Sequence, residues 1–246
     1  MTLLKLSAHN ILELLNTHDL LGQKFNVIVE DSLESTNDYL MQRITHDTQL
    51  TPCTVVLAEE QTKGKGRHGR NWVSPPGNLF LSLYWPFAGN IEKLYGLSLV
   101  VGIAIARVLQ ANGLDAVRLK WPNDIYWQEC KMGGILIETK NKADLVKTVI
   151  GIGLNIMDST NSSIGQKTTC LEKALQRTIN RDRLVVEILV ELDMALTRFA
   201  QHGFTVFVDE WKHFDAGINS NTLDMDLFTR IISADPSLSG GNTSFH

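Results

Sequence analysis

The chain has 246 residues, with 23 Lys plus Arg, 27 Asp plus Glu and a formal net charge of −4. Its 43% hydrophobic and 20% charged residues are typical of a globular protein with a sizeable core, which argues against disorder throughout. The negative total argues against a broad nucleic-acid-binding face, because such faces carry a Lys/Arg excess that neutralises phosphates. The cysteines, Cys53, Cys130 and Cys170, form no CxxC pair, so neither a disulfide framework nor a structural zinc site is expected.

The N-terminal part of the chain predicts a helix, a strand and a second helix. The first 22 residues are interrupted by polar side chains and lack a small-residue cleavage site, so they predict an amphipathic helix at Leu12–Leu21 and not a signal peptide. A strand at Phe25–Val29 precedes Ser32–Asn37, whose hydroxyls can cap a helix that runs through Ile44. No run of about 18 apolar residues occurs, so we expect no membrane span and a cytoplasmic location.

The remainder of the chain alternates predicted strands with two long helices. Apolar residues recur every three or four positions in two segments, which predicts helices at Lys93–Gln110 and Arg183–Phe199. Short apolar runs predict strands at Thr54–Ala58, Leu79–Tyr84, Val117–Lys120, Gly134–Glu138 and Val149–Ile156. This order of elements favours an α+β fold, with a mixed β-sheet and helices packed on one face.

A basic, glycine-rich loop at Gln61–Trp72 is the most unusual segment. Its positive charges, four within eight residues, belong to Lys63, Lys65, Arg67 and Arg70. Its glycines are Gly64, Gly66 and Gly69. Because glycine has no side chain, backbone N–H groups in such a loop can approach a ligand closely and surround an anion. The loop therefore predicts an anion-binding site.

Several interpretations compete for this loop. Its glycine spacing matches a dinucleotide fingerprint, but that motif must open a helix, whereas Pro75, Pro76 and a predicted strand follow here. No phosphate-loop string GxxxxGK[ST] and no kinase signature occurs. A solvated basic turn is the simplest alternative. It is disfavoured by Lys120–Asp124, which puts a lysine beside tryptophan at a strand end, followed by a proline, an amide and a carboxylate.

Glycines also interrupt two predicted strands, at Lys131–Ile137 and Gly151–Asn155. A glycine inside a strand marks either close approach of a ligand or another backbone, or a bulge or tight packing. Both explanations stay open from the sequence.

Taken together these segments resemble the biotin protein ligases, which adenylate biotin and attach it to a lysine of a carrier protein. The matching strings are Glu34–Asn37, Gln61 with Gly64–Trp72, Ser74–Pro75, Lys120–Asp124, Lys131–Glu138 and Gly151–Asn155. They follow the family's order and spacing. The resemblance implies the biotin–lipoate ligase core, which is like that of class II aminoacyl-tRNA synthetases, with ATP and Mg²⁺ as cofactors and biotin as substrate.

The resemblance also implies roles for individual residues. The residues that it implies for biotin binding are Ser35, Thr36, Asn37, Gln61, Gly64, Lys65, Gly66, Arg67, Lys120 and Gly134. The residues that it implies for ATP binding are Arg67, Arg70, Trp72, Lys120, Asn123, Asp124 and Asn155, and Asp124 is also implied as a magnesium contact. Lys120 and Arg67 are the expected catalytic residues, because a cation between the biotin carboxylate and the α-phosphate lowers the barrier to their approach. Short hydroxyl and amide side chains suit the two donors and one acceptor of a buried urea.

Domain organisation and partners are inferred from the same resemblance. We expect a catalytic domain at 1–210 and a truncated or atypical C-terminal segment at 211–246, since the family's SH3-like barrel needs some 45 residues. Only 34 residues precede Ser35, so we expect a monofunctional ligase without the DNA-binding domain of some members. The implied partner is a biotin carboxyl carrier protein of acetyl-CoA carboxylase or another carboxylase. Some relatives dimerise through their sheets, so a homodimer stays open.

Two other functions remain as alternatives: a lipoate or octanoate ligase, which shares the fold and the acyl-adenylate chemistry, and a non-catalytic biotin-binding protein. Gln61, the basic loop and Lys120–Asp124 favour biotin over lipoate. We also expect the empty loop to be mobile until ligand arrives, because four crowded positive charges repel one another.

Overall fold

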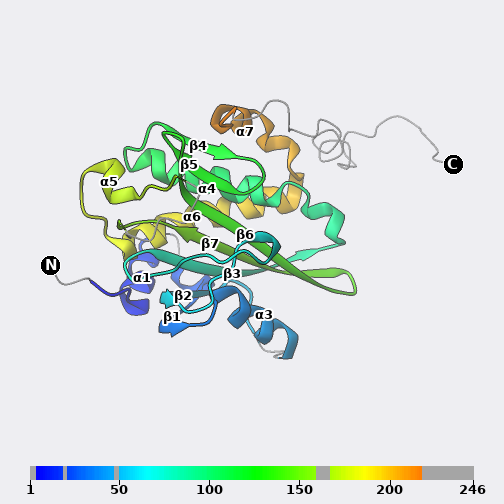
Figure 1. Cartoon of the computed structure of the whole chain (residues 1–246). Helices are drawn as coiled ribbons and strands as arrows, with labels where there is room; N and C mark the ends of the chain where they lie inside the picture. The colour runs from blue at the N-terminus through cyan, green and yellow to red at the C-terminus, as the bar shows by residue number, and fades with distance from the viewer. Residues whose placement is uncertain (1–3, 19–20, 47–49, 159–166, 218–246) are drawn as a thin grey trace.

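The computed structural model describes residues 4–18, 21–46, 50–158 and 167–217, and a twisted seven-stranded sheet forms its centre (Figure 1). The strands are β1 (Asn26–Leu33), β2 (Thr54–Gln61), β3 (Leu79–Ala88), β4 (Val117–Lys120), β5 (Asp124–Trp127), β6 (Cys130–Lys142) and β7 (Leu145–Leu154). Their order across the sheet is β1-β2-β3-β7-β6-β5-β4. β1 and β2 pair in parallel and all other neighbours are antiparallel. The predicted mixed sheet is confirmed.

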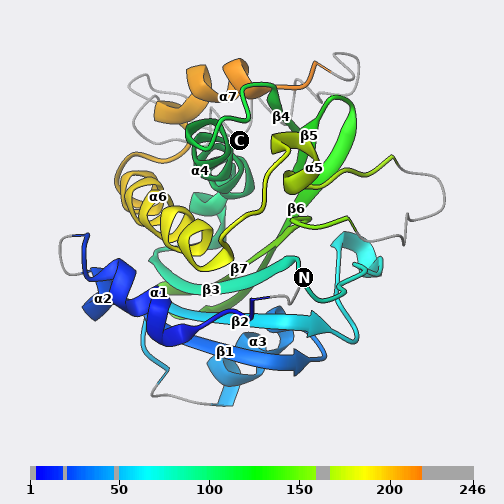
Figure 2. The ribbon, with the colours of Figure 1, turned by 90° about the vertical axis from the view of Figure 1, so that its left-hand side faces the viewer.

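Helices cover both faces of this sheet (Figure 2). The α-helices are α1 (Ala8–Leu15), α2 (Leu21–Lys24), α3 (Thr36–His46), α4 (Leu97–Ala111), α5 (Leu171–Leu175), α6 (Arg181–His202) and α7 (Val208–Phe214). Short 3₁₀ turns are η1 (Arg67–Gly69), η2 (Ile91–Leu94) and η3 (Thr205–Phe207). Helices α1, α4 and α6 contribute to the main core on one face, while α3 packs against β2, β3 and β7 on the other.

The placement of α3 differs from the expectation of helices on one face, and the strand sequences explain why. Along β3, Leu79, Leu81 and Leu83 enter the main core, whereas Tyr84 belongs to a second cluster with Leu40 of α3. Strands β2 and β3 are buried almost continuously, on both faces. A strand that is apolar on both faces needs cover on both sides, and α3 supplies it.

Element boundaries differ from the prediction mainly at turns. The first helix begins earlier than expected, at Ala8, because the Ser7 hydroxyl accepts a hydrogen bond from the Asn10 N–H at 3.3 Å and caps it. The expected turn at Lys120–Asp124 is the tip of a tight hairpin in which β4 and β5 pair directly. The short helices α5 and α7 were not predicted, since each is too short to show a clear apolar period.

Helix α7 crosses the expected domain boundary between residues 210 and 211. Its Trp211 and Phe214 are 3% exposed and belong to the main core. Just after the helix, the Ala216 N–H donates to the Leu119 carbonyl at 2.9 Å, which extends the sheet beyond β4. The described part of the 211–246 segment is therefore joined to the catalytic core. Residues 218–246 lie outside the described residues, so a shortened C-terminal module stays a prediction.

Within the described ranges one helical segment, Ile91–Ala111, is long and apolar enough to cross a membrane by length and composition. In this fold 67% of that segment's apolar window is buried inside the protein. It contains α4, whose residues Val101, Ile103 and Ile105 are fully buried in the main core. Its hydropathy is therefore that of a central core helix.

Candidate active site

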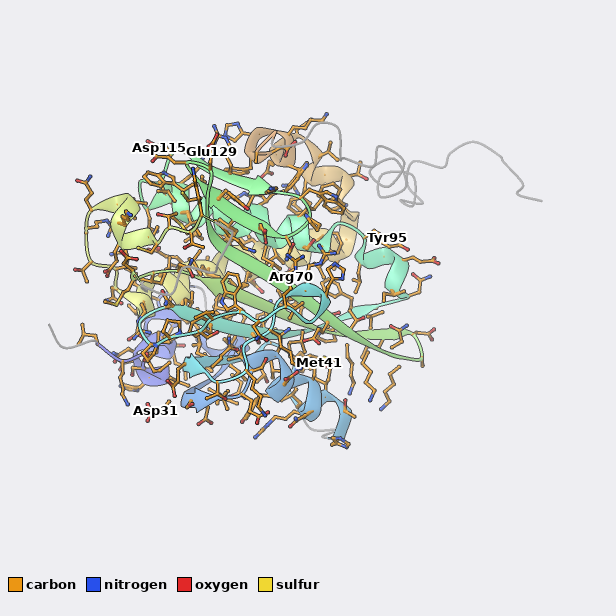
Figure 3. All side chains as sticks on the ribbon, in the orientation of Figure 1. Asp31, Met41, Arg70, Tyr95, Asp115 and Glu129 are labelled. Carbon is orange, nitrogen blue, oxygen red and sulfur yellow. The ribbon has the colours of Figure 1, made fainter. Side chains whose placement is uncertain are left out.

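A cavity of about 410 Å³ opens on the α3 face of the sheet, between the start of α3, the basic loop and strands β6 and β7. The basic loop passes in front of β6 and β7 in the view of Figure 1, and Arg70 on it is labelled in Figure 3. The predicted site residues on the cavity wall are Ser35, Thr36, Asn37, Gln61, Lys65, Gly66, Arg67, Arg70, Trp72, Asn123, Asp124, Gly134 and Asn155. Of the predicted set, Gly64 and Lys120 are the two that do not line it.

One end of the cavity is a neutral hydrogen-bonding cluster built around Gln61, the last residue of β2. The Gln61 Oε1 accepts from the backbone N–H of Thr36 at 2.8 Å and from its hydroxyl at 3.1 Å. The Gln61 Nε2 donates to the Ser74 hydroxyl at 2.9 Å, which in turn donates to the Trp72 carbonyl. A single amide side chain therefore joins the start of α3 to the end of the basic loop. Ser74 was quoted in the sequence pattern without a role.

Beneath this cluster lies a buried network that fixes Asn37. Its Oδ1 accepts from the Ser82 hydroxyl at 2.5 Å, and its Nδ2 donates to Glu138 at 2.8 Å. Asn37 occupies the space that a side chain at Gly151 would need, because a Cβ there would lie 2.2 Å from the Asn37 Oδ1. Tight packing against a neighbouring side chain, one of the open alternatives, explains this glycine. Ser82 on β3 was not predicted, and Glu138 on β6 was part of the matching sequence pattern without a role.

The basic loop is closed against the start of α3 by paired charges. Lys63 lies 2.6 Å from Glu34, and Lys65 lies 2.7 Å from Asp38. The hydrogen bond to Asp38 raises the pKa of Lys65, so this lysine is charged throughout the neutral range. Two of the four crowded positive charges are thus balanced by neighbouring carboxylates, and mobility of the empty loop stays a prediction. Asp38 was not predicted.

Within the loop, hydrogen bonds and a glycine set the backbone path. The Gly66 N–H donates to the Arg70 carbonyl at 2.7 Å, and the Trp72 N–H to the Gly64 carbonyl at 2.9 Å. A side chain at Gly64 would point into the loop and not into the cavity. Its Cβ would lie 2.4 Å from the Trp72 carbonyl oxygen and 2.4 Å from the Ser74 hydroxyl oxygen. Its predicted part in biotin binding is therefore supported only as packing that lets the loop close.

Trp72 packs on a platform of bare backbone. Gly134 on β6 and Gly153 on β7 are direct partners in the sheet. A Cβ would lie 3.3 Å from the Trp72 ring at Gly134 and 2.7 Å from it at Gly153. Among the described residues, the Trp72 Nε1 is the one buried side-chain nitrogen or oxygen without a hydrogen-bond partner. Glycines in paired strands thus let a large aromatic ring lie flat at the cation-rich end of the cavity.

Asp124 and Lys131 form an ion pair on the same wall. The Lys131 Nζ lies 2.8 Å from the Asp124 Oδ1 and 5.3 Å from the centroid of a Trp72 ring. Lys131 is on the cavity wall, although no role was predicted for it. Among the lining residues described, Asp124 is the sole carboxylate, and no group of three or more His, Cys, Asp or Glu side chains is placed to hold a metal in the described ranges. Magnesium is usually bound by one or two carboxylates together with substrate phosphates, so the magnesium contact of Asp124 stays a prediction.

The remaining polar residues of this wall are held by the sheet. The Asn123 Nδ2 donates to the Ile135 carbonyl at 2.8 Å, and its Oδ1 accepts from Arg67 at 3.4 Å. Asn155 donates from Nδ2 to the Thr169 carbonyl at 3.1 Å. Both amides therefore have fixed orientations and line the cavity, and their role in ATP binding stays a prediction.

Lys120, like Gly64, is not among the residues that line the cavity. It ends β4, is half-buried, and its Nζ lies 5.4 Å from the Tyr126 ring centroid. Its partner across the hairpin is Asp124, so its backbone is adjacent to the cavity wall although its side chain is not part of it. The catalytic role of Lys120 stays a prediction.

Comparisons with known proteins show what the chain is similar to. The chain is 38% identical over 213 residues to the bifunctional ligase/repressor BirA of Escherichia coli, covering 85% of this chain and 65% of that protein. Its fold is similar to biotin protein ligase from Aquifex aeolicus in complex with biotin and ATP (TM-score 0.67, 28% identity, 78% of each chain). It is also similar to the Leishmania major biotin protein ligase in complex with biotinyl-5-AMP (TM-score 0.64, 27% identity, 78% of this chain and 82% of that one).

The chain thus spans somewhat less than two thirds of the length of the curated bacterial relatives it matches. The family model described as the Biotin/lipoate A/B protein ligase family matches residues 29–155, which is just over half of the chain and includes Ser35, the basic loop and Asn155. The chain belongs to the biotin/lipoate A/B protein ligase family.

Proposed function

We propose that this chain is an ATP-dependent biotin protein ligase, which converts biotin to biotinyl-5′-adenylate and transfers the biotinyl group to a lysine of a biotin carboxyl carrier protein. The observation that carries the proposal is a single cavity with two chemically different ends. Thr36 and Gln61 form a neutral hydrogen-bonding end, whereas Arg67, which donates to Asn123, and Lys131, which pairs with Asp124, put cations on the wall at the start of β5. The names of the relatives and the ligands bound in the structural neighbours support the same reading.

The neutral end suits the ureido ring of biotin. The Gln61 oxygen is saturated by Thr36, so the acceptors offered to a ligand there are the hydroxyl oxygens of Ser35 and Thr36. A ligand N–H can donate to these oxygens, and the N–H donors of the loop can satisfy the ring carbonyl. A site built around such bonds can reject an acid that lacks the ring by about 10⁴-fold, because its buried polar groups are then left unpaired. Lipoate lacks the ureido ring and should be rejected.

The positive end suits the triphosphate. In the first step, an oxygen of the biotin carboxylate bonds to the α-phosphorus, the bond from that phosphorus to the bridging oxygen breaks, and pyrophosphate leaves. Both reactants are anions, so fixed cations such as Arg67 reduce their repulsion and stabilise charge in the transition state. In the second step, the carrier lysine amine attacks the anhydride carbonyl, loses a proton, and forms an amide as AMP departs.

The remaining expectations belong to this proposal as well. We infer that Trp72 faces adenine, that Asn123 and Asn155 are nucleotide contacts, and that Lys120 reaches the reacting carboxylate once ligand is bound. The carrier domain of a carboxylase is the proposed macromolecular partner. A cytoplasmic location and the absence of DNA binding are proposed with it.

Incubation of the purified chain with labelled biotin, Mg-ATP and a biotin carrier domain tests the proposal. We expect covalent label on the carrier and release of AMP, with no label on a carrier whose acceptor lysine is replaced by arginine. Labelled lipoate on a lipoyl domain, without biotin transfer, would identify a lipoate or octanoate ligase. Biotin binding with neither adenylate nor labelled carrier would leave a non-catalytic binding protein and refute the ligase.

A further inference from the structure

Asn78 is a buried polar residue outside the cavity, in the turn between the basic loop and β3. It is 1% exposed, and the sequence predicted no role for it. Its Oδ1 accepts from the backbone N–H of Ile156 at 2.8 Å and from that of Met157 at 3.1 Å. A single amide oxygen therefore uses both of its lone pairs on the backbone that follows β7.

The register of β3 and β7 explains what this side chain does for the sheet. The two strands pair as far as Leu79 and Leu154. One position further, the same register places Asn78 opposite Asn155. There the Asn78 side chain, in place of a β3 backbone carbonyl, accepts from the N–H groups that follow Asn155. It thus continues the connection between the two strands beyond the end of their backbone pairing.

Asn78 is itself held in place by a buried ion pair. Arg181 is 6% exposed and donates to the two carboxylate oxygens of Glu59 at 2.9 Å and 3.1 Å. The same guanidinium donates to the Asn78 backbone carbonyl at 3.1 Å. On the side of the basic loop, the Asn78 Nδ2 donates to the Pro75 carbonyl at 3.4 Å. Charge-assisted pairs of this kind have a defined geometry, so the Asn78 oxygen has a fixed direction.

Asn155 lies between this connection and the cavity, whose wall it lines. On the β6 side its N–H donates to the Met132 carbonyl at 2.8 Å, and its Nδ2 donates to the Thr169 carbonyl at 3.1 Å. On the β3 side the hold comes from Asn78 through Ile156, which is fully buried in the main core. A buried N–H that loses its partner is costly, so the end of β7 would shift without the Asn78 oxygen, and Asn155 with it.

We infer that Asn78 is a positioning residue for the nucleotide and that it acts through Asn155. It holds the end of β7 so that the Asn155 amide meets the nucleotide, and it does not touch the ligand itself. The inference deepens the proposed function, on which it rests for the contact between Asn155 and ATP.

Calorimetric titrations of the full chain with Mg-ATP, and separately with biotin, test the inference without any need for turnover. Asn78→Leu keeps the size of the side chain and removes the acceptor. We expect its ATP affinity to fall about tenfold, the equivalent of one hydrogen bond, while its biotin affinity stays unchanged. Asn78→Asp keeps an oxygen that can accept from both N–H groups, so it should restore ATP affinity to within about threefold of the unaltered chain.

A double variant identifies the residue through which Asn78 acts. Asn155→Ala should weaken ATP binding by itself. If Asn78 acts through Asn155, the chain with both Asn78→Leu and Asn155→Ala binds ATP no more weakly than the chain with Asn155→Ala alone, because coupled residues are not additive.

The matched control for a loss of stability is Thr54→Val. Thr54 is fully buried at the start of β2, outside the cavity, and its hydroxyl donates to the Thr51 carbonyl at 2.7 Å. This variant also loses a buried hydrogen bond, but its ATP affinity should equal that of the unaltered chain. Thermal unfolding of each variant sets a temperature at which all chains are folded. If Asn78→Leu does not fold, Asn78→Ser, which is too short to reach Ile156, takes its place.

Any of five results would overturn the inference. They are normal ATP affinity in Asn78→Leu, an equal loss of biotin affinity there, no recovery in Asn78→Asp, an additive loss in the double variant, and normal ATP affinity in Asn155→Ala. Carrier labelling separates this inference from the proposed function. A chain that labels no carrier but gives the expected binding pattern would refute the ligase and retain the role of Asn78, whereas a chain that labels the carrier with normal ATP affinity in Asn78→Leu would do the reverse.

Discussion

The two ends of the cavity are built by opposite means. At the neutral end, Thr36, Asn37 and Ser82 are 4% exposed or less and are tied to three strands by hydrogen bonds that already exist without ligand. At the cationic end, Arg70 stands on the basic loop and is open to solvent. Because buried polar groups must be paired and exposed charges need not be, the first end is rigid and selective while the second can adjust to a charged ligand.

Gly151→Ala should have the largest effect, on the hydrogen-bonded network at the neutral end of the cavity. The new Cβ would lie 2.2 Å from the Asn37 Oδ1, so Asn37 must move and its bonds to Ser82 and Glu138 are lost. We expect a loss of stability of about 1–3 kcal/mol from overpacking, measured by denaturant unfolding, and about 100-fold weaker biotin binding from misplacement of Thr36.

The double variant Gly151→Ala/Asn37→Ala provides the control for this overlap. Removing the Asn37 amide makes room for the Cβ, so the two substitutions should not be additive in stability. Additive losses would mean that Gly151 matters for a reason other than its contact with Asn37.

Gln61→Met keeps the side-chain volume but removes the amide that joins α3 to the loop. The Thr36 N–H and the Ser74 hydroxyl then lose their partner, at a cost of roughly 1–3 kcal/mol. We expect biotin affinity by calorimetry to fall about 10-fold or more, with ATP affinity in the absence of biotin unchanged. A similar loss for both ligands would show that the two ends are not independent.

Arg70→Ala tests the adjustable end. Loss of one exposed cation should raise the KM for ATP by about tenfold at low salt and by less at high salt, because exposed charges are screened. The KM for biotin should stay unchanged. Arg118→Ala, at an exposed position on β4 outside the cavity, is the matched control. If Arg118→Ala raised the KM for ATP as much as Arg70→Ala, the effect would come from the net charge of the protein and not from a cation at the cavity.

Asp38→Asn should have the smallest effect, since it removes a largely exposed ion pair with Lys65. We expect little change in global stability but faster tryptic cleavage within the basic loop, by a few-fold. Asp31→Asn, which removes the exposed partner of Lys5, should leave the cleavage rate unchanged. If Asp38→Asn also leaves it unchanged, the ion pair does not hold the loop closed.

The same contact predicts a pH dependence of loop closure. The Asp38 hydrogen bond raises the pKa of Lys65 above the ordinary 10.5 in the closed state. Because the pKa of Lys65 is raised, the ion pair stabilises the closed loop fully below pH 10.5. This stabilisation is lost only as the pH rises through the pKa that Lys65 has in the closed loop. Tryptic sensitivity of the loop should therefore be constant from pH 7 to 9 apart from the protease's own pH profile, which the Asp31→Asn chain calibrates.

Much of this site could be predicted from local sequence. The loop of Gly64 to Trp72 combines charge density with glycine in a way that ordinary turns do not, and the hydroxyl cluster before α3 lies at a strand end where a cap is needed. Asp38, Ser82 and Lys131 could not be predicted in the same way. Each is an ordinary polar residue within a regular element, and its importance arises from a partner on another element.

The sequence by itself determined the strands other than β5, the long helices and the concentration of positive charge in one loop, because apolar periodicity and composition act over neighbouring residues. Only the tertiary structure decided what those charges face. Pairing of β6 with β7 brings Gly134 and Gly153 together under Trp72, and the β5–β6 pairing brings Asp124 within reach of Lys131. Charge-charge and van der Waals interactions depend on distance in space, and strand register sets that distance for residues far apart in the chain.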